Sequence, residues 1–302
     1  MTMDRREIPV VIAFDKNILV QAKVCLQSLL KSSVSSEFYH IICMHKSVAK
    51  DDLKQFSHLI STGENCSIEY IDMSDHFKDA YTAGAGPDSV VTYYRFLIPR
   101  LLNRYERIIY VDVDYIFRSG LGDLYYNEDL EGYYLAGVRD LGIINLYRDY
   151  LQKMGINPNK YINAGFLLMN LKLINQDKLV EVWLKEAADE NAKRIFMDQD
   201  ILNLTCHGKI KFLRAKYNFI SMEEKNLFDP DEYEEAVKKG NIHYAGKKPW
   251  LCWRGIIWWK YYFKLPFNQR NIYFFMQSLC YITYHSLFVG VKFPKPGFIK
   301  KK

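Results

Sequence analysis

The clearest structural signal in this chain is the segment Arg107-Ile108-Ile109-Tyr110-Val111-Asp112-Val113-Asp114. Its apolar residues form a short continuous run, which is typical of a strand buried on both faces of a sheet, and two aspartates frame its end. Working outward toward the start of the chain, similar runs alternate with segments of helical spacing. Strands are expected at 10–14, 40–44 and 67–71, and helices at 18–30 and 48–60. This alternation predicts an α/β fold with a Rossmann-like parallel sheet, right-handed crossovers and helices on both faces.

The later part of the chain adds further elements to this pattern. A helix is expected at 89–97, and strands at 133–138, 163–169 and 242–246. A short helix is expected to start after Asp198, because aspartate is common at helix N-caps. Ligands of such sheets bind at the carboxyl ends of the strands, so the residues that follow each strand are the first candidates for a site.

Composition excludes several classes of protein. The 302 residues are 49% hydrophobic and 25% charged, which is sufficient for a sizeable core and argues against disorder. The 16 glycines and 9 prolines are spread irregularly, which excludes a collagen-like chain. The 6 cysteines include no Cys-X-X-Cys pair, so we interpret them as buried small side chains in a reducing compartment. Residues 1–7 are charged and unlike a secretory signal, and a cytoplasmic location is therefore expected.

Asp112 and Asp114 are the first candidate site residues. Side chains two positions apart on an extended chain point to the same side, so their carboxylates would meet at the open end of a buried strand. Like charges at that distance raise each other's pKa unless a cation lies between them. A divalent ion such as Mn²⁺ or Mg²⁺, shared with substrate phosphates, would meet this need. The alternative is that one aspartate caps the next segment and the other is solvated; the apolar strand before them favours the metal.

A second candidate is the segment His243-Tyr244-Ala245-Gly246-Lys247-Lys248-Pro249-Trp250. A single histidine at a strand end is usually a hydrogen-bonded structural residue. A glycine and two lysines directly after it are instead typical of a phosphate-binding turn with a nearby metal ligand. Together with the two aspartates, His243 would complete an O,O,N ligand set that favours Mn²⁺ somewhat over Mg²⁺.

Three further positions remain open between a functional and a structural role. Asp198 and Asp200 either face a ligand or serve as carboxylates favoured at a helix N-terminus. The segment 163–165, Asn-Ala-Gly, offers a donor–acceptor pair and a close backbone approach, or else a plain turn before a strand. Arg95 is either a charge near the pocket or an exposed helix residue.

In this order, these segments resemble the family 8 glycosyltransferases of the GT-A fold, especially bacterial galactosyl- and glucosyltransferases that build lipopolysaccharide and related surface glycans. The resemblance covers roughly residues 8–260, and several ordered motifs are far more specific than any one of them. The segments that carry it are Ala13-Phe14-Asp15-Lys16-Asn17, Thr92-Tyr93-Tyr94-Arg95, Tyr110-Val111-Asp112-Val113-Asp114, Asn163-Ala164-Gly165-Phe166, Asp198-Gln199-Asp200-Ile201-Leu202-Asn203 and His243-Tyr244-Ala245-Gly246-Lys247-Lys248-Pro249-Trp250.

The resemblance implies a UDP-sugar donor, a glycan or glycolipid acceptor, and Mn²⁺, with Mg²⁺ as the alternative ion. The metal ligands it implies are Asp112, Asp114 and His243. Residues implied to bind the donor are Ala13, Asp15 and Asn17 at the uridine, Arg95, Val113, Asn163, Ala164 and Asp198 around the metal site and the sugar, and Gly246 and Lys248 at the diphosphate. One residue fewer than in related sequences separates His243 from the Lys-Pro-Trp motif, so Lys247 and Lys248 both remain candidates for the diphosphate contact.

The resemblance also implies a retaining reaction, with Gln199 and Asp198 at the reacting sugar. A double displacement would need a carboxylate nucleophile beneath the anomeric carbon, as in retaining glycosidases. The matching position holds Gln199, whose amide is a poor nucleophile. We therefore expect attack from the front face, with the departing phosphate accepting the proton of the acceptor hydroxyl.

The C-terminal end differs from the rest of the chain. Residues 247–302 contain 11 of the 41 lysines and arginines and no acidic residue, together with 16 of the 46 aromatic residues. Residues 254–264 indicate an aromatic helix with basic edges, and residues 271–291 carry no charge over a length that could just span a bilayer. Six polar residues within that stretch favour a position in the membrane interface, and the flanking basic residues favour anionic lipid. The alternative is a small helical subdomain packed on the body.

We accordingly expect a GT-A catalytic domain at 1–250 and a C-terminal helical, basic and aromatic membrane-association segment at 251–302, which would place the protein on the inner face of the cell membrane. Nucleic-acid binding is not expected, because the body is acidic and no recognition motif is present. Two other functions compete: a phosphohydrolase with an Asp nucleophile in the Asp-X-Asp motif, and a non-catalytic protein that binds a sugar nucleotide.

Overall fold

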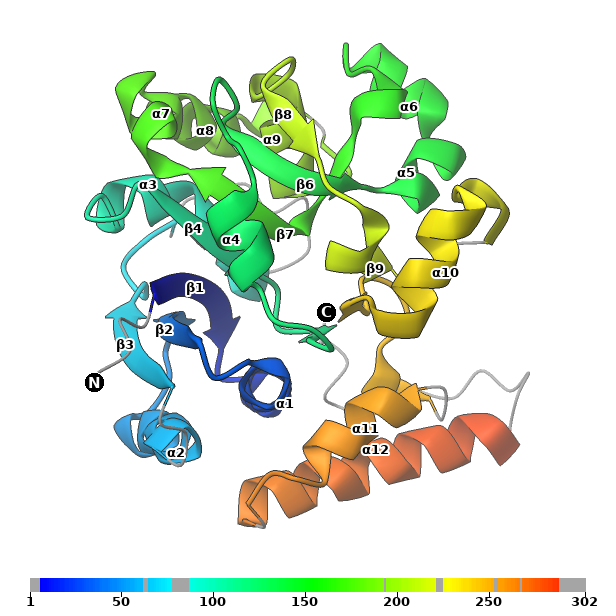
Figure 1. Ribbon diagram of the computed structural model, residues 1–302. Coiled ribbons are helices and arrows are strands. Elements are labelled where there is room, and N and C mark those ends of the chain that lie inside the picture. Colours follow the sequence, from blue (N-terminus) through cyan, green and yellow to red (C-terminus); the bar gives the residue numbers. More distant parts are fainter. Residues whose placement is uncertain are drawn as a thin grey trace.

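The computed structural model describes residues 6–61, 65–77, 87–192, 194–220, 225–252, 255–266 and 268–287 (Figure 1). Parts of the sequence interpretation lie outside these ranges: the charged residues 1–5, Arg254 at the start of the expected aromatic helix, and residues 288–302, which hold the end of the uncharged stretch and the last basic residues.

The strands of the central sheet lie in the order β3-β2-β1-β4-β7-β6-β8. Their bounds are β1 (Arg6–Asp15), β2 (Glu37–Lys46), β3 (Cys66–Asp72), β4 (Arg107–Val111), β6 (Leu135–Arg139), β7 (Ile162–Asn170) and β8 (Ile210–Phe212). The predicted parallel pairing of the first strands is confirmed, because β1 pairs in parallel with β2 and β4, and β2 with β3. The central position of β4 fits its continuous apolar run, since a strand in the middle of a covered sheet is buried on both faces.

The parallel pairing predicted from the first half of the chain does not continue to β7. This strand runs antiparallel to both of its neighbours, β4 and β6, with Val111 opposite Phe166. The antiparallel direction has a functional consequence, because the start of β7 then lies beside the end of β4. Residues 163–165 are in this way brought next to Asp112, whose backbone N–H donates to the carbonyl of Gly165 (2.8 Å).

Helices cover both faces of the sheet, as expected (Figure 1). Alternate residues of β1 divide between two apolar cores: Val10 and Ile12 face one, and Val11 and Ala13 face the other. The first core is closed by α1 (Leu19–Ser32), α2 (Lys50–Ser61), α4 (Gly122–Asn127), α10 (Pro230–Lys239), α11 (Ile256–Tyr262) and α12 (Gln269–Leu287). The second is closed by η1 (Pro87–Leu97), α3 (Ile98–Leu101), α7 (Leu171–Gln176), α8 (Leu179–Ala188) and α9 (Met197–Thr205).

Smaller elements complete the fold. A separate cluster of apolar side chains joins α5 (Leu141–Leu146) to α6 (Arg148–Lys153), and the short turn η2 (Pro158–Lys160) follows them. A second sheet consists of β5 (Tyr115–Ile116), β10 (Ile242–His243) and β9 (Phe219–Ile220), in that order. The remaining short turns are η3 (Glu190–Ala192), η4 (Ala215–Tyr217), η5 (Lys225–Leu227) and η6 (Pro249–Leu251).

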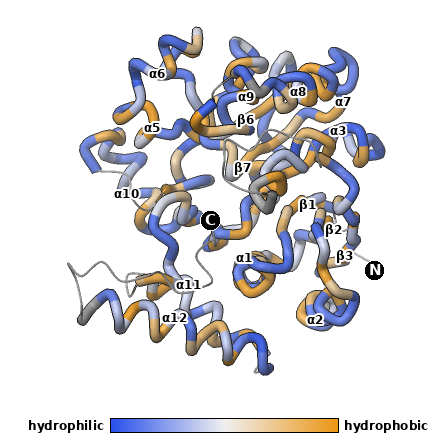
Figure 2. The backbone as a smooth tube through the Cα atoms, turned by 180° about the vertical axis from the view of Figure 1, so that it is seen from behind, coloured by the Kyte–Doolittle hydropathy of each residue, from blue (hydrophilic) through white to orange (hydrophobic). Residues whose placement is uncertain are grey.

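The helices at the C-terminal end lie side by side and pack on the body (Figures 1 and 2). Trp258 of α11 is fully buried in the first core and stacks on Tyr262, with ring centroids 5.6 Å apart. Arg270 of α12 forms an ion pair with Asp52 of α2 (2.9 Å). These two helices therefore pack on the body, as in the alternative that the sequence left open. None of the described helices combines the length and apolar character that a membrane span requires.

Candidate active site

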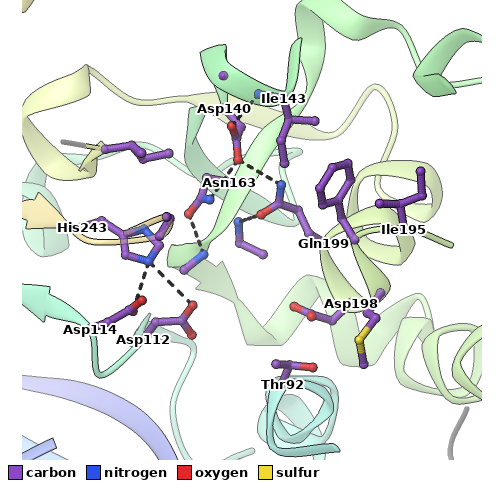
Figure 3. A pocket seen from close by; sticks show the side chains of 18 of the residues that line it. Thr92, Asp112, Asp114, Asp140, Ile143, Asn163, Ile195, Asp198, Gln199 and His243 are labelled. Carbon is purple, nitrogen blue, oxygen red and sulfur yellow. Dashed lines mark hydrogen bonds and ion pairs between the residues drawn. The ribbon is translucent and has the colours of Figure 1, made fainter. Parts of the chain in front are cut away.

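Three potential metal ligands converge at the carboxyl end of β4 (Figure 3). Asp112 and Asp114 follow the strand directly, and β10 pairs with β5 so that His243 lies opposite Tyr115. The Nε2 atom of His243 lies 3.2 Å from an Asp114 oxygen and 3.9 Å from an Asp112 oxygen. The three ligand atoms all lie within 4.8 Å of one another. Residues 129 positions apart in the sequence thus form the O,O,N group that the motifs predicted.

The close approach of β7 depends on Gly165. A Cβ atom at this position would lie 2.2 Å from Cε1 of His243 and 2.8 Å from Oδ2 of Asp112. Both distances are shorter than any van der Waals contact, so a side chain here would push the ligands apart. The role predicted for this glycine, a close backbone approach, is confirmed by the structure.

Cationic neighbours compensate the charge of the two aspartates. Lys248 donates to Asp114 and also to the carbonyl of Tyr244 (3.0 Å). Burial by itself would raise the pKa of Asp114, but Lys248 and His243 outweigh burial and hold that pKa well below its usual range. Asp114 is therefore a carboxylate at neutral pH, which is the form that binds a metal ion.

Arg95, on η1, links the metal-ligand group to α9. Its guanidinium contacts Asp112 (2.9 Å) and Asp198 (3.1 Å), donates to the carbonyl of Ala164, and lies 4.3 Å from the centre of the Tyr110 ring. Burial would lower the pKa of Arg95, but Asp198, Tyr110 and Asp112 raise it, so the group stays charged. The interpretation of Arg95 as an exposed helix residue is wrong, because 2% of its surface is accessible.

Asp198 is the carboxyl group in the site whose pKa moves upward. Burial raises the pKa of Asp198 to about 6; Arg95 opposes this shift and Asp112 adds to it. The backbone just before it is also unusual, since Met197 has φ of +42°, in the left-handed region that disfavours side chains. The helix α9 starts at Met197, so the expected start after Asp198 is wrong. The reason is that Asp198 turns to Arg95 instead of capping the helix.

Asp200 takes the structural role that had been left open for the two aspartates. It is fully buried and accepts hydrogen bonds from Tyr150 and Tyr161, each at 2.6 Å. It also accepts from the backbone N–H of Phe196 (2.9 Å), the residue before the helix. This carboxylate therefore fixes the start of α9 and the orientation of the segment that presents Asp198.

Gln199 is held at both ends of its amide (Figure 3). Its Oε1 accepts from the backbone N–H of Ala164 (2.9 Å), and its Nε2 donates to Asp140 (3.1 Å). Asp140 also accepts from Nδ2 of Asn163 (3.0 Å). Asn163 in turn accepts from the backbone of Gly165 (2.9 Å) and from Asn218 (3.0 Å). The segment 163–165 is thus a hydrogen-bonded part of the site and not a plain turn.

These residues line a cavity of about 600 Å³. Ten of the residues predicted from the sequence border it: Arg95, Asp112, Asp114, Asn163, Ala164, Asp198, Gln199, His243, Gly246 and Lys248. Five do not: Ala13, Asp15, Asn17, Val113 and Lys247. Asn17 folds back on Asp15, donating to it from the backbone (2.8 Å) and the side chain (3.0 Å). Of the two lysines that the sequence could not separate, Lys248 borders the cavity and Lys247 is exposed outside it.

Sequence reasoning missed Asp140, although a signal was present. Asp140 directly follows strand β6, as Asp112 follows β4, and its carboxylate caps α5 by accepting from the backbone of Ile143 (3.0 Å). Because one carboxylate follows each of two strands of the same sheet, the two carboxylates could have been expected at the same edge of that sheet. The apolar side of the cavity was missed as well, and it consists of Ile143, Leu146, Ile195, Phe196, Ile220 and Leu227.

The donor set fits a divalent cation. Two carboxylates and one imidazole nitrogen suit Mn²⁺ or Mg²⁺ better than a soft metal, because no thiolate is present in the group. Asp112 and Asp114 lie between β4 and β5, His243 lies on β10, and Asp112 is the most exposed of the three, at 30% of its side chain. One side of the group is therefore open toward the cavity, where a ligand could complete the coordination.

Comparison with known sequences identifies the family. The sequence model described as glycosyl transferase family 8 matches residues 9–254. The chain belongs to glycosyl transferase family 8. Within this family, the chain is 27% identical over 271 residues to a lipopolysaccharide 1,2-glucosyltransferase of Escherichia coli. The aligned region covers 86% of this chain and 76% of that protein. It is 26% identical to a putative glycosyltransferase of Haemophilus influenzae, over 72% of this chain and 62% of the relative.

Solved structures confirm the GT-A type of fold. The bifunctional glycosyltransferase WbbM superimposes with a TM-score of 0.75 at 21% identity, over 94% of this chain and 53% of WbbM. The galactosyltransferase LgtC, solved with donor and acceptor sugar analogues, superimposes with a TM-score of 0.71 at 22% identity, over 87% of this chain and 98% of LgtC. The chain thus spans about half of WbbM and less than two thirds of the Haemophilus relative.

Proposed function

We propose that this chain is a retaining hexosyltransferase that moves galactose or glucose from a UDP-sugar to a hydroxyl group of a lipopolysaccharide-type or other cell-surface glycan. The observation that carries the proposal is the convergence of Asp112, Asp114 and His243 in the wall of the cavity. Membership of family 8 supports it, and so do relatives named as lipopolysaccharide 1,2-glucosyltransferase and 1,3-galactosyltransferase.

The donor diphosphate would lie at the metal-ligand group. A Mn²⁺ or Mg²⁺ ion bound there would act as a Lewis acid on the leaving diphosphate. Lys248 and the backbone at Gly246 border the same part of the cavity and would neutralise the charge that develops on the leaving group. Ala13, Asp15 and Asn17 are proposed to receive the nucleoside, since β1 ends next to β4.

The sugar ring would lie between Arg95, Asp198 and the segment 163–164. Asp198 is held in place by Arg95 and so is oriented to bind sugar hydroxyls. Gln199 is fixed by Ala164 and Asp140, with its amide oxygen at the cavity wall. An amide is a poor nucleophile, so a double displacement through Gln199 is disfavoured. This supports front-face attack, in which the departing phosphate accepts the proton of the acceptor hydroxyl.

The acceptor is proposed to approach from the apolar side of the cavity. Leu146 and Ile195 are 75% and 52% exposed there, and the rings of Tyr147 and Phe196 contact edge to face at 5.0 Å. Exposed apolar and aromatic surfaces of this kind suit the carbon face of a sugar ring. Asp140 adds a carboxylate next to this surface for the acceptor hydroxyls.

The C-terminal helices are proposed to attach the protein to the inner face of the cell membrane. Ile272, Tyr273, Met276 and Leu279 recur at helical spacing on α12 and are all exposed. Arg270 and Lys264 lie nearby and are exposed as well. An apolar face next to basic residues is typical of binding to an anionic membrane surface.

A UDP-release assay over a panel of sugar nucleotides tests the enzymatic proposal. With Mn²⁺, we expect slow hydrolysis of one donor, UDP-galactose or UDP-glucose, and no turnover after EDTA is added. Release of inorganic phosphate from a simple phosphate ester would instead support a phosphohydrolase. Tight UDP binding without turnover, in the presence of glycan acceptors, would support a non-catalytic binding protein.

A further inference from the structure

A second cavity, of about 220 Å³, lies between α1, α2 and the turn that joins α11 to α12. None of its lining residues borders the candidate active site. Lys23 of α1 borders it from one side, and Gln55 and Leu59 of α2 from another. Leu265 and Asn271, from the C-terminal segment, complete it. The cavity therefore exists only because the C-terminal helices pack on the body.

Lys23 is unusual because its charge is buried without an opposite charge. Only 3% of its surface is exposed. Its ammonium group donates one hydrogen bond, to Oε1 of Gln55 (2.6 Å), and lies 5.6 Å from the centre of the Phe56 ring. Within the described ranges, no carboxylate oxygen lies within ion-pair distance of it. Burial, followed by repulsion from Arg270, lowers the pKa of Lys23 to about 8, while Asp52 opposes the shift.

The positive charge of Lys23 is not neutralised by a neighbouring carboxylate among the described residues, so an anion would stabilise it. Asp52 is already engaged by Arg270 (2.9 Å), so it does not neutralise Lys23 directly. A buried ammonium with one neutral acceptor is costly, because buried charges are normally paired. Two of its three N–H donors have no acceptor among the described residues. Two exposed residues of α2, Lys54 and His58, border the same cavity, and Lys54 is paired with Asp51 (2.8 Å).

The remaining wall has a mixed character. Leu59, Leu265 and Pro266 provide apolar surface. The carboxamide of Asn271 donates to the carbonyl of Pro266 (2.8 Å), and its Oδ1 is buried with no hydrogen-bond partner among the described residues. A ligand that fits must therefore carry a negative group for Lys23 and a short apolar part for the leucines and the proline.

We propose that this cavity binds a phosphate monoester that carries a short apolar chain, with the phosphate at Lys23 and the chain against Leu59 and Leu265. Such a group occurs in soluble phosphate esters and, among membrane lipids, in phosphatidic acid, and the site recognises the chemistry that they share. The ligand would touch both the body and the C-terminal segment, which are already joined by the hydrogen bond from Asn268 to Gln55 (3.3 Å). The proposal does not depend on the transferase function.

Calorimetric titration of the full chain with hexyl phosphate tests this assignment. UDP and Mn²⁺ are present at saturation to occupy the other phosphate site. Two variants remove the anion site without opening the fold: Lys23→Met keeps the length of the side chain, and Gln55→Glu places a carboxylate against the ammonium. Lys31→Met, at an exposed lysine near the end of the same helix, is the matched control.

We expect hexyl phosphate to bind the native chain and Lys31→Met equally. Its affinity for both site variants should fall by about tenfold or more, because each variant loses a charge-assisted contact. Inorganic phosphate should bind more weakly than hexyl phosphate. Phosphatidylcholine vesicles that contain phosphatidic acid, if they compete with hexyl phosphate while pure phosphatidylcholine vesicles do not, would identify a lipid head group as the source. Absence of competition would identify a soluble ester. The assignment is overturned if the native chain does not bind hexyl phosphate, if the site variants bind it normally, or if inorganic phosphate binds as tightly.

Discussion

Carboxylates alternate with nitrogen-bearing side chains around the active-site cavity. Asp112 lies between Arg95 and His243, and Asp114 lies between His243 and Lys248. This arrangement lets two carboxylates sit two residues apart without the repulsion that would otherwise protonate one of them. The price is a strict geometry, because each of these groups is fixed by a neighbour.

The glycine at the start of β7 is the most sensitive test of that geometry. Replacement of Gly165 by alanine should reduce the affinity for Mn²⁺ by about tenfold or more, because loss of a ligand contact costs at least one charge-assisted interaction. The affinity is measured by calorimetry, and circular dichroism checks that the variant is folded. Unchanged Mn²⁺ affinity in a folded variant would show that the three ligands do not act together.

Gln199→Ala tests the role of the polar group at the reacting side. We expect turnover to fall by about 100-fold and UDP affinity to change little, because the amide would contact the sugar and not the nucleotide. The measurement is steady-state UDP release together with UDP binding. Complete loss of turnover with intact UDP binding would instead assign an essential catalytic step to this residue.

For single residues, the sequence predicted the site where a motif directly follows a strand, and it predicted less elsewhere. Asp112, Asp114 and His243 were predicted as a group because each type is a known metal ligand in a recognisable context. Asp140 was missed because its importance comes from two partners, Asn163 and Gln199, that are distant in sequence. No local pattern reports such a contact.

Among the elements, β7 positions the site. Its direction could not be predicted, because a buried apolar run is the same for a parallel and an antiparallel strand. The expected helices at 18–30 and 48–60 correspond to α1 and α2 within two residues, since their apolar spacing is regular. The expected helix at 89–97 is the 3-10 turn η1, which presents Arg95 to the site. The expected strand at 133–138 is β6, shifted toward Asp140.

The packing of α11 on α1 predicts that the C-terminal helices contribute to global stability. Trp258→Ala should lower the free energy of unfolding by about 3–5 kcal/mol, since it removes a large buried side chain. Phe263→Ala, at a site that is 61% exposed, should cost about 1 kcal/mol or less. Urea denaturation measures both. Equal, small effects would mean that the helices are attached loosely to the body.

For the whole molecule, the question is how an acidic body with a basic end finds its substrate. The basic and aromatic character of the C-terminal end follows from composition, but composition could not show that Trp258 and Tyr262 face the body. The structure divides the aromatic residues of this end between a buried side and an exposed one. The exposed side is what remains for a partner.

Binding to vesicles tests the proposed membrane contact. A triple variant carries Tyr273→Ser, Met276→Ser and Leu279→Ser. Its affinity for phosphatidylglycerol vesicles should fall by about tenfold or more, because the variant removes apolar surface that would be inserted into the membrane. Val237→Ser on α10, at an equally exposed apolar position away from these helices, is the control and should bind normally. Normal binding by the triple variant would exclude this face as the contact.

The most direct test of the whole account is the affinity of UDP measured by calorimetry, with Mn²⁺ and then with EDTA, for the native chain and for Asp112→Asn. The account predicts that UDP binds the native chain with Mn²⁺ and that either EDTA or the substitution weakens binding by about tenfold or more. Equal UDP affinity under all of these conditions would contradict it, because the two carboxylates and the imidazole would then hold no ion for the phosphates of a donor.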